Sequence, residues 1–423
     1  MRKIIHRAIL SIIVLLSIAA PSFATDGYFN TGYGVIQQGQ GGAGVALPSD
    51  SLVGATNPAG LALVGDRFDF GLTLFRPFRD ASITGNELPE GFPDVNGHYD
   101  ANRVKNFFVP ELGFSHSLSP RLALGVSIFG NGGMNTSYTT PIFLLGTTRG
   151  GVDLEQLFLS PTIAFKATEH NAFGLAVNIV YQRFSAEGLQ NFASPSYSSA
   201  PAYVTNTGYS NSYGAGVRVG WLGQLTPIVS VGATFQTETY ASKFSRYRGL
   251  FAEQGGFDIP ANAAAGVSLK VSPEVTVLVD GEGIFYGQVR AIANLDSNQA
   301  PLGASDGPGF GWHDIAAIKT GIDYQVTHSL TVRGGYNHSS LPFDGTQTFF
   351  NLLAPAVVQN HLHLGATWTS QSGKELSIAY VHAFGENVNG VDSIPPTAGG
   401  GNANLHMYQN SIEIGFGWNR NKK

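Results

Sequence analysis

Several features common in other protein classes are missing from this 423-residue sequence. It contains no cysteine, which excludes disulfide bonds, thiolate metal ligands and thiol nucleophiles. Charged residues make up only 13% of the chain, about half the fraction usual in soluble proteins. Beyond the N-terminus no apolar run reaches the roughly 20 residues that a membrane-spanning helix needs. The formal net charge of -5 argues against a nucleic-acid partner, which requires a basic surface.

The first residues have the organisation of a secretory signal peptide. A basic region contains Arg2, Lys3 and Arg7. An apolar region follows over residues 8–20, and Ser22–Ala24 has the small-x-small pattern of a cleavage site. The alternative, a retained helical anchor, is disfavoured because the apolar region is too short to span a bilayer. We therefore expect an exported protein that is cleaved after its small-x-small site.

Alternating side chains dominate the rest of the chain. From Arg67 to Trp418 the sequence repeats segments of about ten residues in which apolar side chains alternate with small or polar ones. In the segment 171–186, for example, Phe173 belongs to an apolar face and Ala172 to the opposite face. The breaks between segments are alternately short and long. Because outer-membrane barrels have short periplasmic turns and long extracellular loops, this pattern predicts an up-and-down β-barrel in the bacterial outer membrane.

The predicted fold class is all-β: a fourteen-stranded antiparallel transmembrane β-barrel, with the even strand number expected of single-chain bacterial barrels. The approximate strands are 67–80, 102–116, 121–131, 152–167, 171–186, 208–224, 228–245, 258–271, 274–291, 312–326, 329–340, 357–370, 374–388 and 404–418. The apolar face of each should contact lipid and the other face the lumen. Aromatic residues near strand ends fit the interfacial girdles, namely Trp221, Tyr240, Trp312 and Trp368.

A barrel of this size encloses a lumen too wide for its own side chains to fill, so a plug is expected. The residues between the cleavage site and the first strand lack strand alternation and are rich in glycine and other small residues. The predicted organisation is therefore a signal peptide at 1–24, an N-terminal hatch at 25–64 and a transmembrane barrel at 65–423.

One stretch of the expected hatch carries a resemblance to a known family. The sequence GQGGAGVALPSDSLVGATNPAGLAL, placed before a barrel, resembles FadL-type outer-membrane transporters of long-chain fatty acids and other hydrophobic compounds. The resemblance extends to GVSIFGNGG, VDLEQLFLSPTIAFK and FGLAVNIVYQRFSAEG. It implies a small hatch that occludes the barrel and carries an Asn-Pro-Ala motif, here Asn57, Pro58 and Ala59. A proline at this point fixes its own φ and extends the preceding residue, which makes a rigid corner.

The resemblance also implies a kink in the third strand that opens a lateral gap beside the hatch. The matching residues are Gly130, Asn131, Gly132 and Gly133. Three glycines in four residues weaken a β-ladder and suit a bulge or bend. The alternative is that these residues begin an extracellular loop. If they form the kink, ligand is expected to leave sideways into the bilayer.

Charged lumen residues are candidates for ligand binding. Arg333 alternates with apolar neighbours and is expected to face inward, and Arg183 lies late in the fifth strand. In fatty-acid transporters of the family, a basic residue late in this strand helps to hold the ligand carboxylate. Gly188 stands at that position here, which puts the carboxylate site and a fatty-acid substrate in doubt.

Apolar patches within the polar loops are further ligand-binding candidates. The clearest contains Phe143, Leu144 and Leu145, and others occur at 250–251 and 352–355. Exposed apolar clusters tend to mark binding sites. Alternatively, these patches pack against one another and cap the barrel.

Other motifs carry less weight. Gly39, Gly41 and Gly44 match the dinucleotide fingerprint, but they follow no strand and open no βαβ unit, so a close-packed plug explains them better. His361 and His363 share one strand face and should point into the lumen, where polar lining is favoured over a metal site. The Gly-x-Ser-x-Gly motif of serine hydrolases does not occur, and we do not expect enzymatic activity. We expect neither a bound metal nor a cofactor.

The sequence as a whole therefore predicts a monomeric outer-membrane channel for passive uptake of hydrophobic small molecules, most of all long-chain fatty acids. Its surroundings would be outer-membrane lipid and lipopolysaccharide. An aromatic-hydrocarbon importer of the same family is the alternative, and a surface adhesin is the alternative from a different class. A general porin is disfavoured by the low charge, since its constriction needs charged residues.

Overall fold

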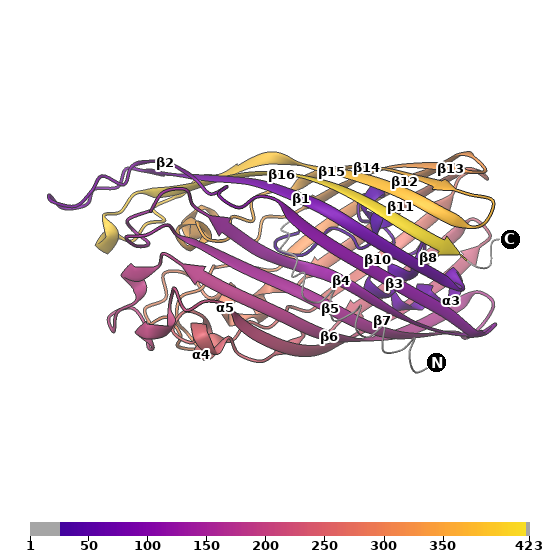
Figure 1. Cartoon of the computed structure of the whole chain (residues 1–423), viewed down its shortest axis with the longest axis horizontal. Coiled ribbons are helices and arrows are strands. Elements are labelled where there is room, and N and C mark those ends of the chain that lie inside the picture. Colours follow the sequence, from indigo (N-terminus) through magenta and orange to yellow (C-terminus); the bar gives the residue numbers. More distant parts are fainter. Residues whose placement is uncertain (1–25, 420–423) are drawn as a thin grey trace, which may run out of the picture.

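The computed structural model describes residues 26–419, so the expected signal peptide with its cleavage site lies outside the described residues. Fourteen antiparallel strands close into a barrel (Figure 1). They are β1 (Arg67–Thr84), β3 (Phe107–Ser119), β4 (Leu122–Ser137), β5 (Gly151–Lys166), β6 (Asn171–Glu187), β7 (Ser210–Thr226), β8 (Val229–Gln236), β10 (Asn262–Lys270), β11 (Val275–Ile284), β12 (Ile315–Thr327), β13 (Leu330–Ser339), β14 (Asn360–Thr369), β15 (Lys374–Val388) and β16 (Asn402–Asn419). The predicted fold is confirmed.

The remaining elements are short. Two small strands, β2 (Gly97–Asp100) and β9 (Tyr240–Ala241), pair with β1 and β7. The α-helices are α2 (Val35–Gly39), α3 (Leu61–Val64), α4 (Ala252–Gly255), α5 (Arg290–Ala293) and α6 (Thr348–Asn351). The 3-10 helices are η1 (Ser51–Ala55), η2 (Pro58–Gly60), η3 (Gln190–Phe192), η4 (Pro201–Tyr203), η5 (Ser245–Tyr247), η6 (Tyr286–Gln288), η7 (Gly345–Gln347) and η8 (Pro396–Ala398). None of the helices in the described range is long and apolar enough to cross a membrane.

The first and last strands close the barrel. β1 pairs with β16 over its full length, from Arg67 opposite Asn419 to Thr84 opposite Asn402. The short turns, such as the one between β3 and β4, lie at the end where β1 begins and β16 ends; we call this the turn end. The long connections lie at the opposite end, the loop end, with β2, α4 and α5 (Figure 1).

The predicted alternation of faces is confirmed. On β6 the side chains of Phe173 and Ile179 are exposed on the outer wall, while those of Ala172 and Asn178 are buried in the lumen. On β16, Glu413 is buried between exposed apolar neighbours. An apolar outer face and a more polar lumen are what a closed sheet in a bilayer requires.

Two predicted strands were too long, and one aromatic residue was misplaced. β8 ends at Gln236 and β11 ends at Ile284, because the chain beyond each turns over the loop end, where Tyr286 packs into the interior. Trp312 does not belong to an interfacial girdle. It is buried and stacks edge-on against Tyr286, with ring centroids 5.1 Å apart. The alternation of apolar residues therefore continues beyond the wall strands, into segments that pack inside the mouth of the barrel.

Residues 26–64, which we call the N-terminal segment, lie inside the barrel, where most of them are buried. Figure 1 shows this segment in indigo, enclosed by strands, with α3 at the turn end. It is bonded to inward-facing residues of strands around the barrel, including Glu111 on β3, Asp280 on β11 and His363 on β14. The barrel and its filling thus form one packed unit.

Candidate functional site

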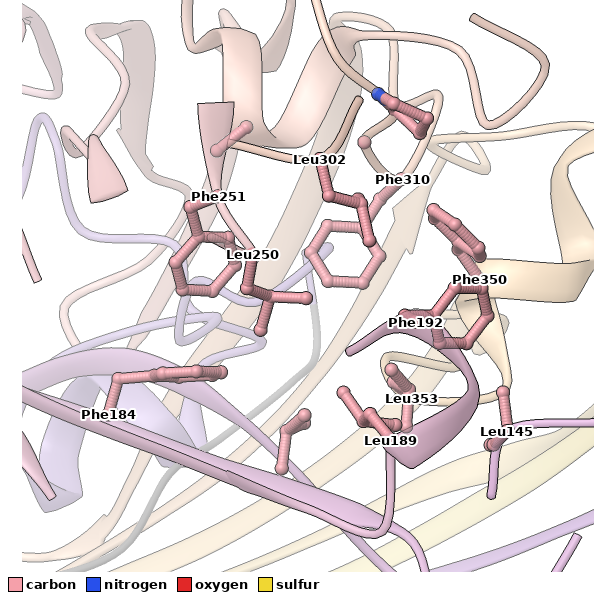
Figure 2. A pocket seen from close by; sticks show the side chains of 14 residues that line it. Leu145, Phe184, Leu189, Phe192, Leu250, Phe251, Leu302, Phe310, Phe350 and Leu353 are labelled. Atoms are coloured by element: carbon pink, nitrogen blue, oxygen red, sulfur yellow. The ribbon is translucent and has the colours of Figure 1, made fainter. Parts of the chain in front are cut away.

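An apolar pocket lies among the long connections at the loop end. It is lined by Leu145, Val152, Phe184, Leu189, Phe192, Leu250, Phe251, Ala291, Leu302, Pro308, Gly309, Phe310, Phe350 and Leu353 (Figure 2). Its volume is about 40 Å³, smaller than the roughly 150 Å³ of a protein cavity that binds benzene, so the loops would have to move to admit either an aromatic ring or an alkyl chain. None of the lining side chains is charged or can donate a hydrogen bond. The pocket is therefore suited to a small uncharged apolar ligand.

The apolar loop patches predicted from the sequence meet at this pocket. Leu145, Phe251 and Leu353 each come from a different patch, and all three line it. Phe143 packs against Phe92, with ring centroids 5.9 Å apart, and against the buried hydrophobic cluster that contains Leu144 and Leu145. The patches thus pack against one another, which was one of the two alternatives, and they enclose a pocket in doing so.

Aromatic side chains connect the pocket to the centre of the barrel. Phe184 and Phe251 of the pocket are in contact, with ring centroids 4.6 Å apart, and Phe251 lies 4.9 Å from Phe257. Phe257 lies 6.3 Å from Tyr28, which lies 5.3 Å from Phe29. All five belong to one buried hydrophobic cluster. The series, which we call the aromatic path, runs from the loop end to the N-terminal segment.

The aromatic path ends where two neighbouring strands separate. β3 and β4 pair from Ser119 opposite Leu122 only as far as Leu112 opposite Ile128. Beyond that point β3 continues to pair with β1, and β4 continues to pair with β5. We call the unpaired stretch between β3 and β4 the seam. The seam is a break in the hydrogen-bonded wall of the barrel.

The glycine-rich residues predicted to form a kink lie beside the seam. They lie within β4 and not in a loop, and the register of β4 on β5 shifts between Gly130 and Gly132, as in a β-bulge. A Cβ atom built on Gly132 would lie only 1.8 Å from the carbonyl oxygen of Tyr28. Only glycine therefore allows the N-terminal segment to approach β4 so closely.

The N-terminal segment occupies the edge of β4 that β3 leaves free. The backbone N–H of Gly133 donates to the carbonyl of Tyr28 at 3.0 Å, and the N–H of Asn30 donates to the carbonyl of Asn131 at 3.0 Å. The hydroxyl of Tyr33 donates to the side chain of Asn131 at 2.9 Å. Residues 28–30 thus replace β3 as the backbone partner of β4 at the seam.

Ionic and polar contacts hold this part of the segment in place. Lys319 on β12 lies 3.2 Å from Asp26 and 2.6 Å from Glu282, and it also donates to the carbonyl of Thr31. The hydroxyl of Tyr286 donates to the carbonyl of Asp26 at 2.6 Å. Burial raises the pKa of the Tyr286 hydroxyl well above its ordinary value, so it remains a donor. Nothing in the linear sequence marks these residues, because their partners come from distant strands.

The Asn-Pro-Ala motif holds a second corner of the segment against the wall. The side chain of Asn57 donates to the carbonyls of Val45 at 2.8 Å and Trp221 at 2.9 Å, and it accepts from the N–H of Ala59 at 3.1 Å. Pro58 is the first residue of η2, where its missing N–H costs no hydrogen bond. The motif therefore forms the rigid corner expected of it.

Comparison with known proteins gives this arrangement a family. The sequence profile of the outer membrane protein transport protein family (OMPP1/FadL/TodX) matches residues 31–394. The chain belongs to this family. Its members are outer-membrane channels and transporters of hydrophobic compounds rather than enzymes. No curated protein matches the chain in sequence.

Solved structures of the OMPP1/FadL/TodX family have the same fold. The Pseudomonas putida toluene transporter TodX is 16% identical, with a TM-score of 0.69 over 92% of this chain and 99% of TodX. A Pseudomonas aeruginosa FadL homologue is 15% identical, with a TM-score of 0.70 over 93% of this chain and 100% of the homologue. The Ralstonia pickettii toluene transporter TbuX is 18% identical, with a TM-score of 0.65 over 92% of this chain and 98% of TbuX.

Arg183, a candidate for ligand binding, points away from the lumen. It shares the outer face of β6 with Tyr181, while Phe184 faces inward. Its guanidinium forms a bidentate ion pair with Glu155 on β5, with both N···O distances 2.7 Å. Arg183 therefore does not face the lumen, where its contact with a ligand was expected. Gly188 has a positive φ of 75° and ends the strand without a side chain.

The other inward-facing candidates contact the N-terminal segment and not the pocket. Arg333 bonds to Asp323, which in turn accepts both hydrogen bonds of the Gln40 amide. His361 and His363 point inward as predicted, and His363 contacts the carbonyl of Gln38 at 2.6 Å. Within residues 26–419, no group of three or more His, Cys, Asp or Glu side chains could hold a metal ion.

The glycines of the dinucleotide-like motif also lie inside the barrel. Gly41 has a φ of 74°, and a Cβ atom on it would lie 2.4 Å from the carbonyl oxygen of Thr320. A Cβ atom on Gly39 would lie 3.0 Å from the Cα atom of Gly365 on β14. Close packing against the barrel wall, the interpretation favoured by the sequence, therefore accounts for them.

Proposed function

We propose that this protein is a monomeric outer-membrane channel through which small uncharged hydrophobic molecules enter the cell by passive diffusion. The ligand enters the loop-end pocket, follows the aromatic path and leaves sideways through the seam into the bilayer. The N-terminal segment acts as the hatch. A single barrel contains the whole route, so no partner subunit is required.

The continuity of the aromatic path carries this proposal. Its apolar side chains run without interruption from Phe184 in the pocket to Phe29, which forms a β-bridge with Gly132 beside the seam. A ligand that moves along it exchanges one apolar surface for another. The driving force is the removal of the ligand from water, about 0.8 kcal/mol for each buried CH₂ group. Neither a nucleotide nor another cofactor is needed for such a route.

The chemistry of the pocket favours aromatic hydrocarbons over fatty acids. The lining contains five phenylalanines and no cation. A fatty-acid carboxylate would lose its hydration there without gaining an ionic or hydrogen-bonding partner, which is unfavourable. Arg183, the one basic residue late in β6, is already paired on the outer wall. Two of the structural neighbours are described as toluene transporters, which agrees with this substrate class.

Lateral exit requires residues 28–30 to leave the edge of β4. Their removal would expose an opening between β3 and β4, at a height where β3 pairs only with β1. The segment is held there by a few polar contacts, of which the ion pairs of Lys319 are the strongest. We propose that a ligand arriving at Tyr28 displaces these residues and that they return after it has left.

Ligand binding to the purified protein tests the substrate class. Toluene and hexadecanoate are titrated separately into detergent-solubilised protein, and binding is followed by the quenching of intrinsic tryptophan fluorescence. We expect saturable binding of toluene only. Phe251→Glu, which places a carboxylate in the pocket, should abolish it. Val391→Glu, which places the same charge on an exposed loop residue, should leave it unchanged.

Two outcomes would contradict the proposal. Tighter binding of hexadecanoate than of toluene would return the substrate to the fatty-acid class. Binding of neither compound, together with adhesion of cells that display the protein, would favour the adhesin alternative.

Exit through the seam is tested separately, with a variant in which a disulfide joins β3 to β4 across the seam. Toluene uptake into proteoliposomes that contain this variant should be reduced. Undiminished uptake would exclude exit through the seam.

A further inference from the structure

A patch of charged and aromatic side chains lies on the outer wall of the barrel, near the seam. It consists of Arg76 and Phe78 on β1, Tyr408 on β16, and Lys105 just before β3; we call it the outer patch. Alternate residues of β1 are buried in the lumen, and Arg76 belongs to the exposed set. The outer patch is therefore separate from the pocket, the aromatic path and the N-terminal segment.

The outer patch lies at the upper edge of the lipid-facing apolar band. From the turn end, the outward residues of β1 are apolar from Phe68 to Leu74, and Arg76 is the first polar one. Its partner on β16 is Asn410, which follows the outward apolar residues that begin at Trp418. At about 3.3 Å per residue and a tilt of about 40°, Arg76 lies about 20 Å above Phe68, near the limit of an apolar band of about 25 Å.

The two cations share one face of an aromatic ring. Tyr408 stacks on Phe78, with centroids 4.5 Å apart and an angle of 5° between the rings, so it covers one face. The guanidinium carbon of Arg76 lies 5.7 Å and the ammonium nitrogen of Lys105 lies 5.5 Å from the centroid of Phe78. Because Tyr408 occupies the first face, both cations lie over the second.

No side chain neutralises these two charges in the described part of the chain, where neither Arg76 nor Lys105 forms a salt bridge. Asp80 lies further along the same face of β1, but its two carboxylate oxygens contact His98 at 3.0 Å and His406 at 2.8 Å. Two like charges on one ring repel each other, and an anion bound between them would relieve this repulsion. Since no described side chain supplies such an anion, it would come from outside the chain.

We propose that Arg76 and Lys105 bind a phosphate group carried by a lipid of the outer leaflet. A phosphate monoester has up to two negative charges and three acceptor oxygens, which match a guanidinium and an ammonium on the same side of a ring. The acyl chains of the lipid would lie along the apolar residues below, from Leu74 toward the turn end. The lipid would thus lie beside β3, the strand that forms one edge of the seam.

Lipid binding to the purified, full-length mature protein tests this assignment. The probes are diphosphorylated lipid A, enzymatically dephosphorylated lipid A and inorganic phosphate, and the readout is lipid stoichiometry by native mass spectrometry. We expect lipid A to bind at a saturable site and its dephosphorylated form to bind much more weakly. Arg76→Gln and Lys105→Gln should each weaken binding about fivefold, and the double variant roughly 25-fold. Inorganic phosphate should not compete at millimolar concentration.

Two further variants separate charge from structure. The exchange Arg76→Lys with Lys105→Arg keeps both charges and should retain binding. Arg121→Gln removes one exposed cation at the turn end and should also leave it unchanged. Migration of each variant as a folded barrel in unheated gel samples shows that the barrel is intact. Undiminished binding by the double variant, or equal binding of dephosphorylated lipid A, would overturn the proposal, and competition by inorganic phosphate would reassign the site to a free anion.

Discussion

Lys319 is the residue on which the closed arrangement of the N-terminal segment depends most. Its ammonium group is buried between the carboxylates of Asp26 and Glu282. Among residues 26–419, no other side chain forms an ion pair with the N-terminal segment. Removal of one partner from a buried ion pair leaves an uncompensated charge, which costs more than the pair itself contributes.

We expect Lys319→Met to lower the free energy of unfolding by about 3–5 kcal/mol, because two buried carboxylates would lose their counter-ion. Urea denaturation of the detergent-solubilised protein measures the change. Combination with Asp26→Asn and Glu282→Gln should recover part of the loss. Lys270→Met, at an exposed position of β10, should change the stability by less than about 0.5 kcal/mol. An equal loss of stability in Lys319→Met and Lys270→Met would show that the ion pairs of Lys319 do not hold the N-terminal segment in place.

The sequence predicts which way a strand side chain points, because alternate residues of a strand face opposite sides; we call this rule strand parity. Parity placed His361 and His363 in the lumen, and the structure confirms it. Parity also places Arg183 on the outer face together with Tyr181, so its assignment to a ligand site conflicted with the pattern of its own strand. The face of the strand on which a residue lies therefore predicts contact with a ligand in the lumen better than its position along the strand does.

Strand β4 has a regular lower half, nearer the turn end, and a bulged upper half, nearer the loop end. The lower half pairs with β3, and the upper half pairs with residues 28–30. Glycine repetition predicted the irregularity. The loss of β3 as a partner could not be predicted, because it depends on where a different strand departs from the sheet.

Gly132→Val should open the seam in the resting protein. Its Cβ would occupy the place of the Tyr28 carbonyl oxygen and displace residues 28–30 from β4. We expect faster toluene uptake into proteoliposomes than for the unaltered protein. Gly281→Val is the matched control, since a Cβ on this strand glycine meets nothing within 4 Å. Equal uptake by both variants would show that residues 28–30 do not close the seam.

The connection between β11 and β12, which contributes to the pocket, contains a carboxyl group sensitive to pH. Burial, together with the nearby carboxylate of Asp344, raises the pKa of Asp296 to about 7. In the unfolded connection its pKa would be about 3.9. Between these two pKa values the packed connection binds a proton that the unpacked connection releases. The protonated carboxyl group therefore stabilises the packed connection fully below about pH 4, and this stabilisation is lost as the pH rises through 7.

Hydrogen exchange of residues 294–311, corrected for intrinsic rates, should therefore show more protection at pH 5 than at pH 8. Asp296→Asn keeps a neutral side chain at every pH and should remove the difference. Persistence of the difference in that variant would assign the effect to another group.

At the scale of the whole molecule, the strand number, the up-and-down order and the long and short connections could be predicted from period and spacing alone. The N-terminal segment could be placed by its composition and its resemblance to a family. The pocket could not, because its lining comes from loops whose packing no linear pattern specifies. The segments 237–245 and 285–291 were misassigned for the same reason, since apolar loops and wall strands share one alternation.

Deletion of residues 26–64 should leave a folded barrel with a much larger conductance. The barrel wall closes through the pairing of β1 with β16 and does not use the N-terminal segment as a strand. Conductance in planar bilayers and migration on unheated gels measure the two properties. A deletion variant that folds but conducts no better than the unaltered protein would show that other residues obstruct the lumen.

The closure of the barrel by its first and last strands sets the order of its assembly. The N-terminal segment leaves the export machinery before any strand, yet the wall around it is complete only when β16 has joined β1. A segment that docks onto the open, partly built sheet is enclosed when the last strand joins the first. Chains that stop before β16 would present this segment, together with its buried partner Lys319, to periplasmic proteases and chaperones.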